Sequence, residues 1–365
     1  MSPVGVAVIG AGVISKAYLE NLTRFPDLQV HVVADLFEPV AAERAAEFGV
    51  PTSGGVETAL QHPDVEIVVN LTIPAAHVEI ASAAVRAGKH VWSEKPFSLD
   101  RPSGLGLLDE AAAAGLRLGC APDTILGAGI QTARRVIERG DIGVPLAGLT
   151  MFQTPGPESW HPNPAFLFQA GAGPLFDMGP YYLTTLAQIF GSFAEVSAVG
   201  GTARPTRVIG SGPKAGEEFT VDVPTHVGLL GSFTGGGSAQ SVFSFESPLV
   251  RAGFVEITGS EATLSLPDPN MFDGDLRIRR TGAEDWESIP LTGPTDGRGL
   301  GVLDMARSIR AVVPHRIPGE LAYHVLDVMV SAGEALADRR VVPVDSTVEI
   351  APTLPEDWDP HARTL

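Results

Sequence analysis

Lys95 is the side chain best suited to proton transfer, and it lies between Glu94 and Pro96 after an apolar run, residues 90–93. Pro96 has a fixed φ and biases the residue before it towards an extended conformation, which would fix the direction in which the lysine leaves the run. A lysine beside a hydroxyl can take or relay its proton, and as an ammonium it can polarise a carbonyl. The alternative is a surface lysine paired with Glu94, and the tripeptide by itself favours that alternative.

Asp177 and Tyr181 are a second candidate pair, four residues apart in the Gly- and Pro-rich segment of residues 171–182. If a helix begins in this segment, both side chains lie on one face of it. An acid and a phenol on one helical turn, facing Lys95 from another domain, would form a proton-handling cluster in a cleft between the domains. The alternative is that Asp177 caps the helix and Tyr181 packs in the core, which the second half of the chain alone would favour.

A glycine-rich turn, residues 10–15, follows the apolar run of residues 4–10 and precedes a run with helical spacing. Gly10 permits a tight turn, and Gly12 has no Cβ, so a pyrophosphate can approach the backbone and the helix N-terminus. Ser15 replaces the third glycine of the dinucleotide fingerprint and is still small. The strand–turn–helix context predicts a dinucleotide site; the alternative is a turn in a similar fold that binds nothing.

Asp35 follows the next apolar run, residues 28–34. Its carboxylate would accept hydrogen bonds from the adenosine ribose hydroxyls and would repel a 2′-phosphate. Residues 36–38 contain no Arg or Lys to pair with a phosphate, so the sequence favours NAD over NADP. Asp35 could also cap the helix expected near Pro39, and both roles can coexist.

A third loop, residues 70–74, ends another strand at the same sheet edge, and His77 lies in the first turn of the helix after it. His77 is either a cofactor neighbour or a polar residue near a helix N-terminus. The predicted cofactor contacts are Gly10, Gly12, Val13, Ile14, Asp35, Leu71, Thr72, Pro74, His77, Glu94 and Lys95.

Strand-like and helical runs alternate up to residue 122. This pattern predicts right-handed βαβ units, and so an α/β Rossmann domain with a doubly wound parallel sheet over residues 1–122. Beyond it, strand-like runs follow one another without helices between them, which predicts an α+β domain with an open, mostly antiparallel sheet over residues 123–365. This domain would bind substrate and form the oligomer, and its C-terminal helices, residues 302–337, could pack back on the first domain.

The chain has 365 residues and a net charge of −18, which is spread over both halves. Such a field opposes nucleic acid and anionic membranes and favours a neutral substrate over an anionic one. No stretch reaches the ~18 apolar residues of a membrane span. No basic region precedes the first apolar run, so we expect a cytoplasmic protein rather than a secreted one.

Cys120, the one cysteine, excludes an internal disulfide framework and a Cys-based zinc site. It stands in an apolar run, so we expect a small buried hydrophobe rather than a nucleophile. His226, His315 and His324 show no metal-ligand spacing with another His, Cys or acid. We therefore expect structural histidines and no bound metal.

Taken together, these motifs resemble the glucose-fructose oxidoreductase / inositol dehydrogenase / rhizopine-catabolism (Gfo/Idh/MocA) family of nicotinamide-dependent dehydrogenases. The resemblance implies that Lys95 is the catalytic lysine, that Glu94 and Pro96 shape its loop, and that Asp177 is a substrate-binding acid. It covers nearly the whole chain and rests on residues 10–15, 74–77, 87–96 and 171–181.

Two features depart from the family pattern. Tyr181 stands where many members carry histidine, although others carry tyrosine. A phenol ordinarily has a pKa near ~10, so Tyr181 would need Lys95 nearby to act as an acid or base. Asp123-Thr124 stand where relatives often show asparagine or arginine near the cofactor, so the contacts of this loop are left open.

Trp160 and His161 lie on a proline-rich loop before the Asp177 segment. The tryptophan could form an apolar wall for a sugar ring or the nicotinamide, and His161 could bind a hydroxyl. The alternative is a loop anchored by one buried indole.

We therefore expect an NAD-dependent oxidoreductase that transfers hydride between nicotinamide and a secondary alcohol or ketone of a sugar, inositol or related polyol. An NAD-retaining glycosidase or lyase that oxidises a sugar carbon transiently would use the same residues. A non-enzymatic NAD or sugar sensor is a further alternative, but a sensor has no need of Lys95, Asp177 and Tyr181. The open sheet of the second domain predicts a homodimer or homotetramer.

Overall fold

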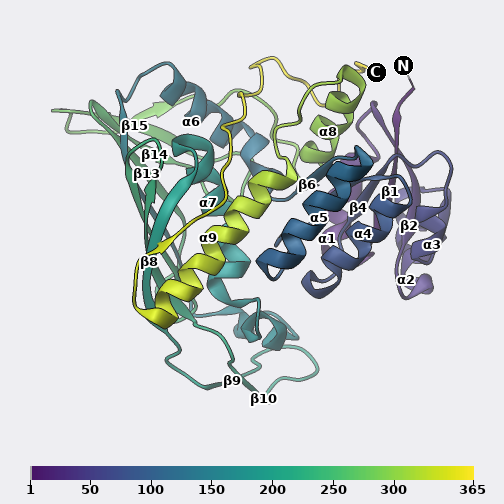
Figure 1. Cartoon of the computed structure of the whole chain (residues 1–365), viewed down its shortest axis with the longest axis horizontal. Helices are drawn as coiled ribbons and strands as arrows, with labels where there is room; N and C mark the ends of the chain where they lie inside the picture. The colour runs from purple at the N-terminus through teal and green to yellow at the C-terminus, as the bar shows by residue number, and fades with distance from the viewer. Residues whose placement is uncertain (1) are drawn as a thin grey trace. The chain divides into compact units, whose positions relative to one another are not determined.

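Continuous apolar runs form a six-stranded parallel sheet in the computed structural model, which describes residues 2–365 (Figure 1). All six residues of the first strand are buried, as expected where helices cover both faces of a parallel sheet. The strand order is β3-β2-β1-β4-β5-β6, so the predicted doubly wound α/β fold is confirmed. The strands are β1 (Val4–Ile9), β2 (Leu28–Ala34), β3 (Thr52–Gly54), β4 (Ile67–Asn70), β5 (His90–Ser93) and β6 (Leu118–Cys120).

Dense internal contacts divide the chain into two units. The first unit runs from the N-terminus to Gln131 and adds Thr292–Leu326 and Ala351–Leu365. The second unit consists of Thr132–Leu291 and Asp327–Ile350. Residue 1, with which the predicted first domain begins, lies outside the described residues.

Helices α2 and α5 of the first unit have residues at their ends that favour those positions. Asp100 accepts the N–H of Ser103 at 2.7 Å and caps α5. Helices α2 and α5 end at Gly49 and Gly115, both with a φ of 66°, which suits glycine. The elements are α1 (Val13–Leu22), α2 (Glu38–Phe48), α3 (Val56–Leu60), α4 (His77–Arg86), α5 (Arg101–Ala114), α8 (Leu300–Ala311) and the 3-10 turns η1 (Pro74–Ala76) and η2 (Asp123–Leu126).

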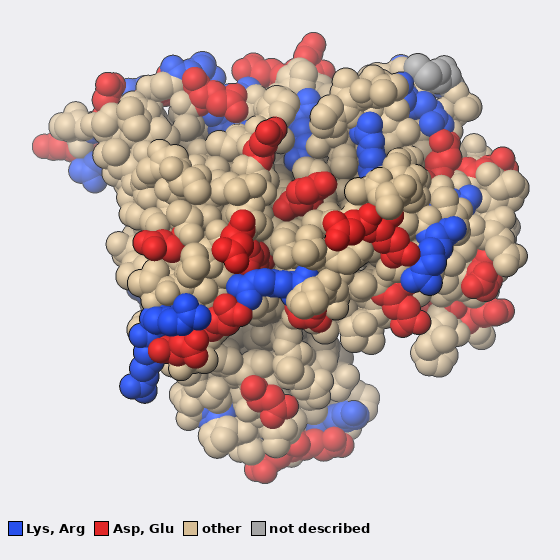
Figure 2. All heavy atoms as spheres, viewed as in Figure 1, with Lys and Arg blue, Asp and Glu red and all other residues tan. Residues whose placement is uncertain are grey.

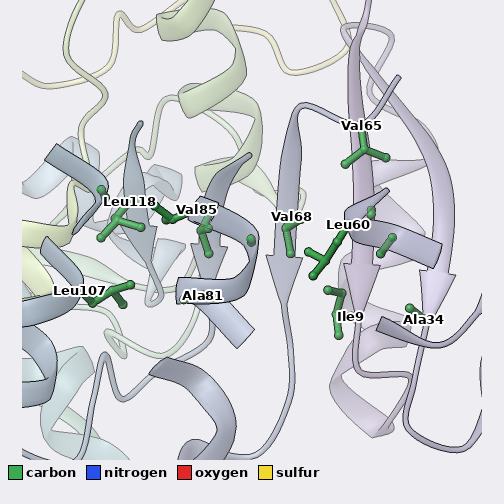
Figure 3. Close-up of a cluster of buried hydrophobic side chains, with 14 of the residues drawn as sticks. Ile9, Ala34, Leu60, Val65, Val68, Ala81, Val85, Leu107 and Leu118 are labelled. Carbon is green, nitrogen blue, oxygen red and sulfur yellow. The ribbon is translucent and has the colours of Figure 1, made fainter. Parts of the chain in front are cut away.

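A cluster of buried apolar side chains joins one face of this sheet to α3, α4 and α5 (Figure 3). Ile9 and Val68 contribute from the strands, and Val85 and Leu107 from the helices. Cys120 belongs to this cluster and is 1% exposed, which confirms the prediction of a small buried hydrophobe. Sequence did not predict β3 or α3, because elements of three and five residues are too short to show a period.

The second unit contains a nine-stranded sheet of order β16-β15-β14-β13-β7-β12-β11-β8-β17. Strands β7 and β12 pair in parallel, and the other pairs are antiparallel. The predicted open, mostly antiparallel sheet is therefore confirmed. The strands are β7 (Pro145–Gln153), β8 (Phe193–Gly201), β11 (His226–Phe233), β12 (Ser238–Ser244), β13 (Arg251–Gly259), β14 (Ala262–Leu266), β15 (Leu276–Arg280), β16 (Glu287–Ile289) and β17 (Val342–Pro343), beside a separate pair, β9 (Thr206–Val208) and β10 (Glu218–Thr220).

One face of the nine-stranded sheet is covered by the helix α7 (Gly173–Phe190). The helix lies so close to the sheet that a Cβ on Gly148 would be 2.7 Å from the side chain of Leu186. The opposite face exposes the apolar side chains of Leu149, Val199 and Leu230, which are 39%, 76% and 55% exposed. The remaining helices are α6 (Ala128–Glu138) and α9 (Gly319–Asp338).

Charge is distributed rather than concentrated. On the face drawn in Figure 2, acidic and basic side chains are interspersed, in line with a net charge of −18 spread over the chain. Among residues 2–365, no helix combines the length and the apolarity that crossing a bilayer requires.

Candidate active site

The glycine turn lies at the carboxyl end of β1. Gly10 has a φ of +104°, and a Cβ there would lie 2.6 Å from the carbonyl oxygen of Leu71, so only glycine fits. Gly12 is the N-cap of α1, and the space where its Cβ would stand is open. Ser15 is fully buried, and its hydroxyl donates to the Gly12 carbonyl at 2.6 Å. The N-terminus of α1 is thus open to an anion, with no acidic residue in the first turn.

Asp35 holds this turn in place from the end of β2. Its Oδ2 accepts the N–H of Ala11 at 2.7 Å, and its Oδ1 accepts the N–H of Phe37 at 2.9 Å. The side chain is half-buried. A carboxylate is therefore positioned beside the glycine turn, where an adenosine ribose would need a hydrogen-bond acceptor.

Exposed apolar side chains surround this edge of the sheet. Val13, Leu36, Phe37 and Ile73 are 92%, 84%, 68% and 70% exposed. Large apolar groups gathered in water favour a ligand with apolar faces, such as an adenine ring. An open helix N-terminus, a ribose-binding acid and these apolar walls fit a dinucleotide, so the first unit has the features of a dinucleotide-binding unit.

Arg44 is a neighbour of the glycine turn that sequence reasoning missed. Its Nη2 donates to the Ala11 carbonyl at 3.3 Å, and its Nη1 donates to Glu47 at 2.6 Å. Glu47 also binds Lys16 at 2.8 Å. Both cations are thus already paired with one carboxylate. No sequence signal marked Arg44, because it stands nine positions after Asp35 on the next helix.

The third loop is organised by Asn70, which is fully buried at the end of β4. Its Oδ1 accepts the hydroxyl of Thr72 at 2.6 Å, and its Nδ2 donates to the His77 carbonyl at 3.0 Å. Leu71 is buried and Pro74 is half-buried. Asn70 therefore sets the shape of this loop. The sequence had predicted its neighbours Leu71, Thr72 and Pro74 as cofactor contacts, but not Asn70 itself.

His77 links this loop to the lysine loop. The ring is 1% exposed. Its Nε2 lies 2.9 Å from the Thr72 carbonyl, and its Nδ1 lies 2.8 Å from the Pro96 carbonyl. Both nitrogens are thus engaged with the protein, and His77 joins the two loops.

The lysine loop follows β5 at the same edge of the sheet. Glu94 is 9% exposed; its Oε1 accepts the hydroxyl of Tyr18 at 2.8 Å and its Oε2 accepts the N–H of Lys95 at 3.1 Å. Trp92 donates to the same tyrosine oxygen at 3.3 Å. Burial raises the pKa of Tyr18 well above its usual range, and the nearby Glu94 carboxylate raises it further, so Tyr18 stays a neutral donor. Lys95 is half-buried, and the Lys95–Pro96 peptide bond is cis.

Asp123 has a structural role in the first unit. It is fully buried, and its Oδ2 accepts the N–H groups of Gly299 at 2.7 Å and Gly301 at 3.2 Å. Burial raises the pKa of this carboxyl, against the opposing effect of Arg298 3.5 Å away. Asp123 thus caps α8, whose own N-cap, Gly299, has no side chain to do so.

In the second unit, Asp177 and Tyr181 lie in the first part of α7, four residues apart and so on one face. Asp177 is half-buried, and Tyr181 is 6% exposed. The next residue, Tyr182, is fully buried and its oxygen accepts the N–H of Gly253 at 2.8 Å. Burial raises its pKa above the ordinary phenol range, so Tyr182 acts as a packing residue of this helix.

Trp160 stands on a loop that is anchored by other residues. It follows the 3-10 turn η3 (Pro157–Ser159) and is 68% exposed, so it is not a buried anchor. Arg207, with a side chain 1% exposed, forms ion pairs with Glu158 and with Glu246, the latter at 2.8 Å. His161 stacks edge-on against the indole with ring centroids 5.6 Å apart. An exposed indole on an anchored loop is available to a ligand.

Comparison with known proteins agrees with this arrangement. The family model described as "Oxidoreductase family, NAD-binding Rossmann fold" matches residues 4–121, and the model of the "GFO/IDH/MocA C-terminal domain" matches residues 130–265. Together they cover more than half of the chain. The chain therefore belongs to the GFO/IDH/MocA family of oxidoreductases, and its first unit is an NAD-binding Rossmann domain.

Relatives with assigned names include sugar and inositol dehydrogenases. Levoglucosan dehydrogenase of Pseudarthrobacter phenanthrenivorans is 27% identical over 72% of this chain and 73% of its own length. Myo-inositol 2-dehydrogenase of Thermotoga maritima is 24% identical over 71% of this chain and 74% of its own length. A solved structure of levoglucosan dehydrogenase in complex with NADH and L-sorbose shares the fold, with a TM-score of 0.83 and 22% identity over 94% of this chain and 99% of that one.

Proposed function

We propose that this protein is an NAD-dependent dehydrogenase that acts on a secondary alcohol, or the corresponding ketone, of a sugar, inositol or related polyol. The observation that carries the proposal is the lysine loop, in which Glu94 and His77 hold the backbone on either side of Lys95 at the sheet edge of the NAD-binding domain. The named relatives act on sugars and inositols. Residues 1–122 are proposed as the cofactor domain and residues 123–365 as the substrate and oligomer domain.

The cofactor would be bound by the three loops and the lysine segment. Asp35 would accept the ribose hydroxyls, and the N-terminus of α1 at Gly12 would face the pyrophosphate. When bound, NAD supplies the acceptor for the hydride that leaves the substrate carbon. The proposed contacts are Gly10, Gly12, Val13, Ile14, Asp35, Leu71, Thr72, Pro74, His77, Glu94 and Lys95.

The substrate would be bound by polar side chains of the second unit and by Lys95. We propose that Tyr181, assisted by Lys95, takes the hydroxyl proton during oxidation and returns it in the reverse direction. Asp177 would accept hydrogen bonds from the hydroxyls, which need partners when buried. Trp160 and His161 would form one wall of the sugar site. The net charge of −18 favours a neutral substrate over an anionic one.

NAD is the proposed cofactor in preference to NADP. The Asp35 carboxylate would lie where a 2′-phosphate must be placed. Arg44 and Lys16, the cations close to the glycine turn, are both paired with Glu47. A 2′-phosphate would therefore be repelled by Asp35, and it would have to displace Glu47 from Lys16 and Arg44 to find a cation. A kcat/KM for NADP equal to or above that for NAD would contradict this interpretation.

The proposed assembly is a homodimer or homotetramer that covers the exposed face of the nine-stranded sheet. Leu149, Val199 and Leu230 lie on that face, opposite α7. Covering apolar side chains in water stabilises association. Sedimentation of the wild-type chain and of a Leu230→Glu variant tests this, because a charge on this apolar face would dissociate the oligomer.

The decisive experiment is a panel of sugars and inositols incubated with NAD or NADP, with reduced cofactor followed by absorbance. We expect NADH to accumulate with at least one polyol and not with its deoxy analogue at the oxidised carbon. If a glycoside is cleaved while NADH never accumulates, the protein is an NAD-retaining glycosidase or lyase. If Lys95→Ala leaves the biological effect unchanged, the protein is a sensor.

A further inference from the structure

His31, His62 and Asp64 form a cluster in the first unit that the proposed dehydrogenase reaction does not use. One ligand atom from each side chain lies within 4.8 Å of the others. Among residues 2–365, this is the one place where at least three such side chains come together. The two imidazoles are stacked with centroids 5.0 Å apart and an interplanar angle of 25°. Sequence spacing did not reveal the cluster, because 31 positions separate the two histidines.

A β-bulge directs His31 towards this cluster. Val30 pairs with Val6 and Val32 pairs with Ala7, so His31 is the extra residue of β2 opposite β1. Bulges are rare in parallel sheets, and they redirect a side chain at the cost of a local disruption of the hydrogen-bond ladder. The bulge is thus at His31, which is the metal-ligating side chain that β2 contributes to the cluster.

The loop that carries His62 and Asp64 is held firmly. Lys89 donates to the His62 carbonyl at 3.1 Å and to the Val65 carbonyl at 2.7 Å. Gly5 of β1 packs directly under the loop, since a Cβ there would lie 1.7 Å from the Asp64 carbonyl oxygen. The backbone that carries these ligands therefore loses little entropy when an ion binds.

The chemistry of the cluster suits a borderline divalent ion. Two imidazoles and one carboxylate are ligands for Zn²⁺, Co²⁺ or Ni²⁺ rather than for Mg²⁺ or Ca²⁺. A tetrahedral ion needs its ligand atoms roughly 3.4 Å apart at bond lengths of about 2.1 Å. Asp64 is exposed and can move, and one imidazole has to turn out of the stack so that the lone pairs of both rings point at the same ion. Nδ1 of His62 accepts the Asp64 N–H at 3.3 Å, a long bond that competes weakly with a metal.

We propose that His31, His62 and Asp64 form a binding site for one Zn²⁺-like transition-metal ion, with a fourth position open to water. The ion would tie β2 to the segment before β4, and these two elements flank β1 on either side. The site stabilises the first unit and revises the expectation that the chain binds no metal. Asp64 precedes the amino end of β4, whereas the cofactor loops follow the carboxyl ends of the strands. Metal and NAD therefore bind at opposite ends of the sheet.

Titration of the full, untagged, chelator-treated chain with Zn²⁺ alone tests the site, with Co²⁺ absorption as the spectroscopic readout. We expect one tight equivalent, a Co²⁺ spectrum typical of tetrahedral coordination, and a melting temperature that rises with Zn²⁺. His62→Gln and Asp64→Asn are expected to weaken Zn²⁺ binding at least about tenfold and to abolish the melting shift. Melting of each variant without metal shows whether it is folded.

His361→Gln is the matched control, because His361 pairs with Asp296 at 2.6 Å in an exposed imidazole–carboxylate pair. It should keep the tight equivalent, and saturation with NADH should also leave that equivalent in place. The proposal is overturned if folded His62→Gln binds Zn²⁺ as the wild type does, if His361→Gln removes the tight equivalent, or if NADH displaces the ion.

Discussion

The lysine loop of the first unit and the Asp177–Tyr181 turn of the second unit are positioned by different forces. Lys95 lies in an irregular loop whose neighbours are held by hydrogen bonds from Tyr18 and His77. Asp177 and Tyr181 lie on the helix α7 on either side of Pro180, and the helical period sets their direction. Polar partners far away in the sequence therefore control the first group, and the helical backbone controls the direction of the second.

This difference has consequences for mutation. A hydrogen bond to a buried carboxylate has a defined geometry, so removing one partner moves the loop or leaves a charge poorly satisfied. A helix distributes positional control over its successive backbone hydrogen bonds, so we expect one substitution to move Tyr181 less than it moves Lys95. The following changes test this contrast.

Lys95→Ala should have the largest effect. Loss of the amine removes the group that assists proton transfer, and we expect kcat to fall by about 10²–10⁴-fold. NADH binding, followed by fluorescence, should remain within an order of magnitude of wild type. Lys95→Arg keeps the charge and serves as the control. A Lys95→Ala variant with near-normal kcat would remove Lys95 from the reaction.

Tyr181→Phe should reduce kcat by roughly 10²-fold, because it removes the hydroxyl but keeps the ring that packs in α7. Its melting temperature should stay close to that of the wild type. The pH profile of kcat for oxidation is the second readout, since a proton acceptor must be deprotonated to act and losing it should flatten the rise of kcat with pH. An unchanged kcat and pH profile would show that Tyr181 only packs.

Tyr18→Phe tests whether hydrogen bonds position the lysine loop. It removes the donor to the buried Glu94 carboxylate, and we expect a loss of up to about 3 kcal/mol in the free energy of unfolding. Activity should fall roughly tenfold through kcat rather than KM, since the loop no longer holds Lys95 in place.

Tyr182→Phe is the matched control in the second unit. The Tyr182 hydroxyl oxygen accepts the N–H of Gly253, so this variant also removes one hydrogen bond of a buried tyrosine. It should lower stability by about 1 kcal/mol and leave kcat almost unchanged. If both tyrosine variants affect kcat equally, the contrast between the loop and the helix is wrong.

His315 should make the first unit sensitive to mild acid. Burial lowers its pKa to about 4, and its Nε2 lies 3.0 Å from the Leu118 carbonyl. The unfolded chain takes up a proton near pH ~6.5, before the folded protein does, so stability falls as the pH drops from there towards 4. We expect a loss of roughly 2 kcal/mol between pH 7 and pH 5.

Urea unfolding at these two pH values measures the effect. His315→Gln should lose most of this pH dependence, and His226→Gln, at an exposed position of β11, should keep it. Equal pH dependence in wild type and His315→Gln would show that burial does not control this imidazole.

Much of the architecture was predictable because it follows from the periodicity of apolar residues along the chain. Continuous apolar runs identified most strands of the parallel sheet, and the glycine turn after residues 4–9 marked the dinucleotide edge. The segment around Asp177 did form a helix. The elements β3, α3, β9, β10, β14, β16 and β17 were missed, since short or edge strands and single helical turns carry too few residues to show a pattern.

Several site features were out of reach of the sequence. Asp123 caps α8 from more than 170 positions away. Asn70 and Arg44 hold their loops through contacts that sequence spacing does not predict. Exposure could not be judged either: Trp160 is exposed, whereas His77 is buried between two loops.

The sequence by itself determined the fold class, the NAD-binding edge and the family, because periodicity, glycine positions and short motifs are local properties that the chain carries wherever it folds. Only the tertiary structure decided which distant polar groups meet. It brought Tyr18 to Glu94 and His31 to His62, because sheet order and one extra residue in β2 control those encounters, and neither is encoded in a local period.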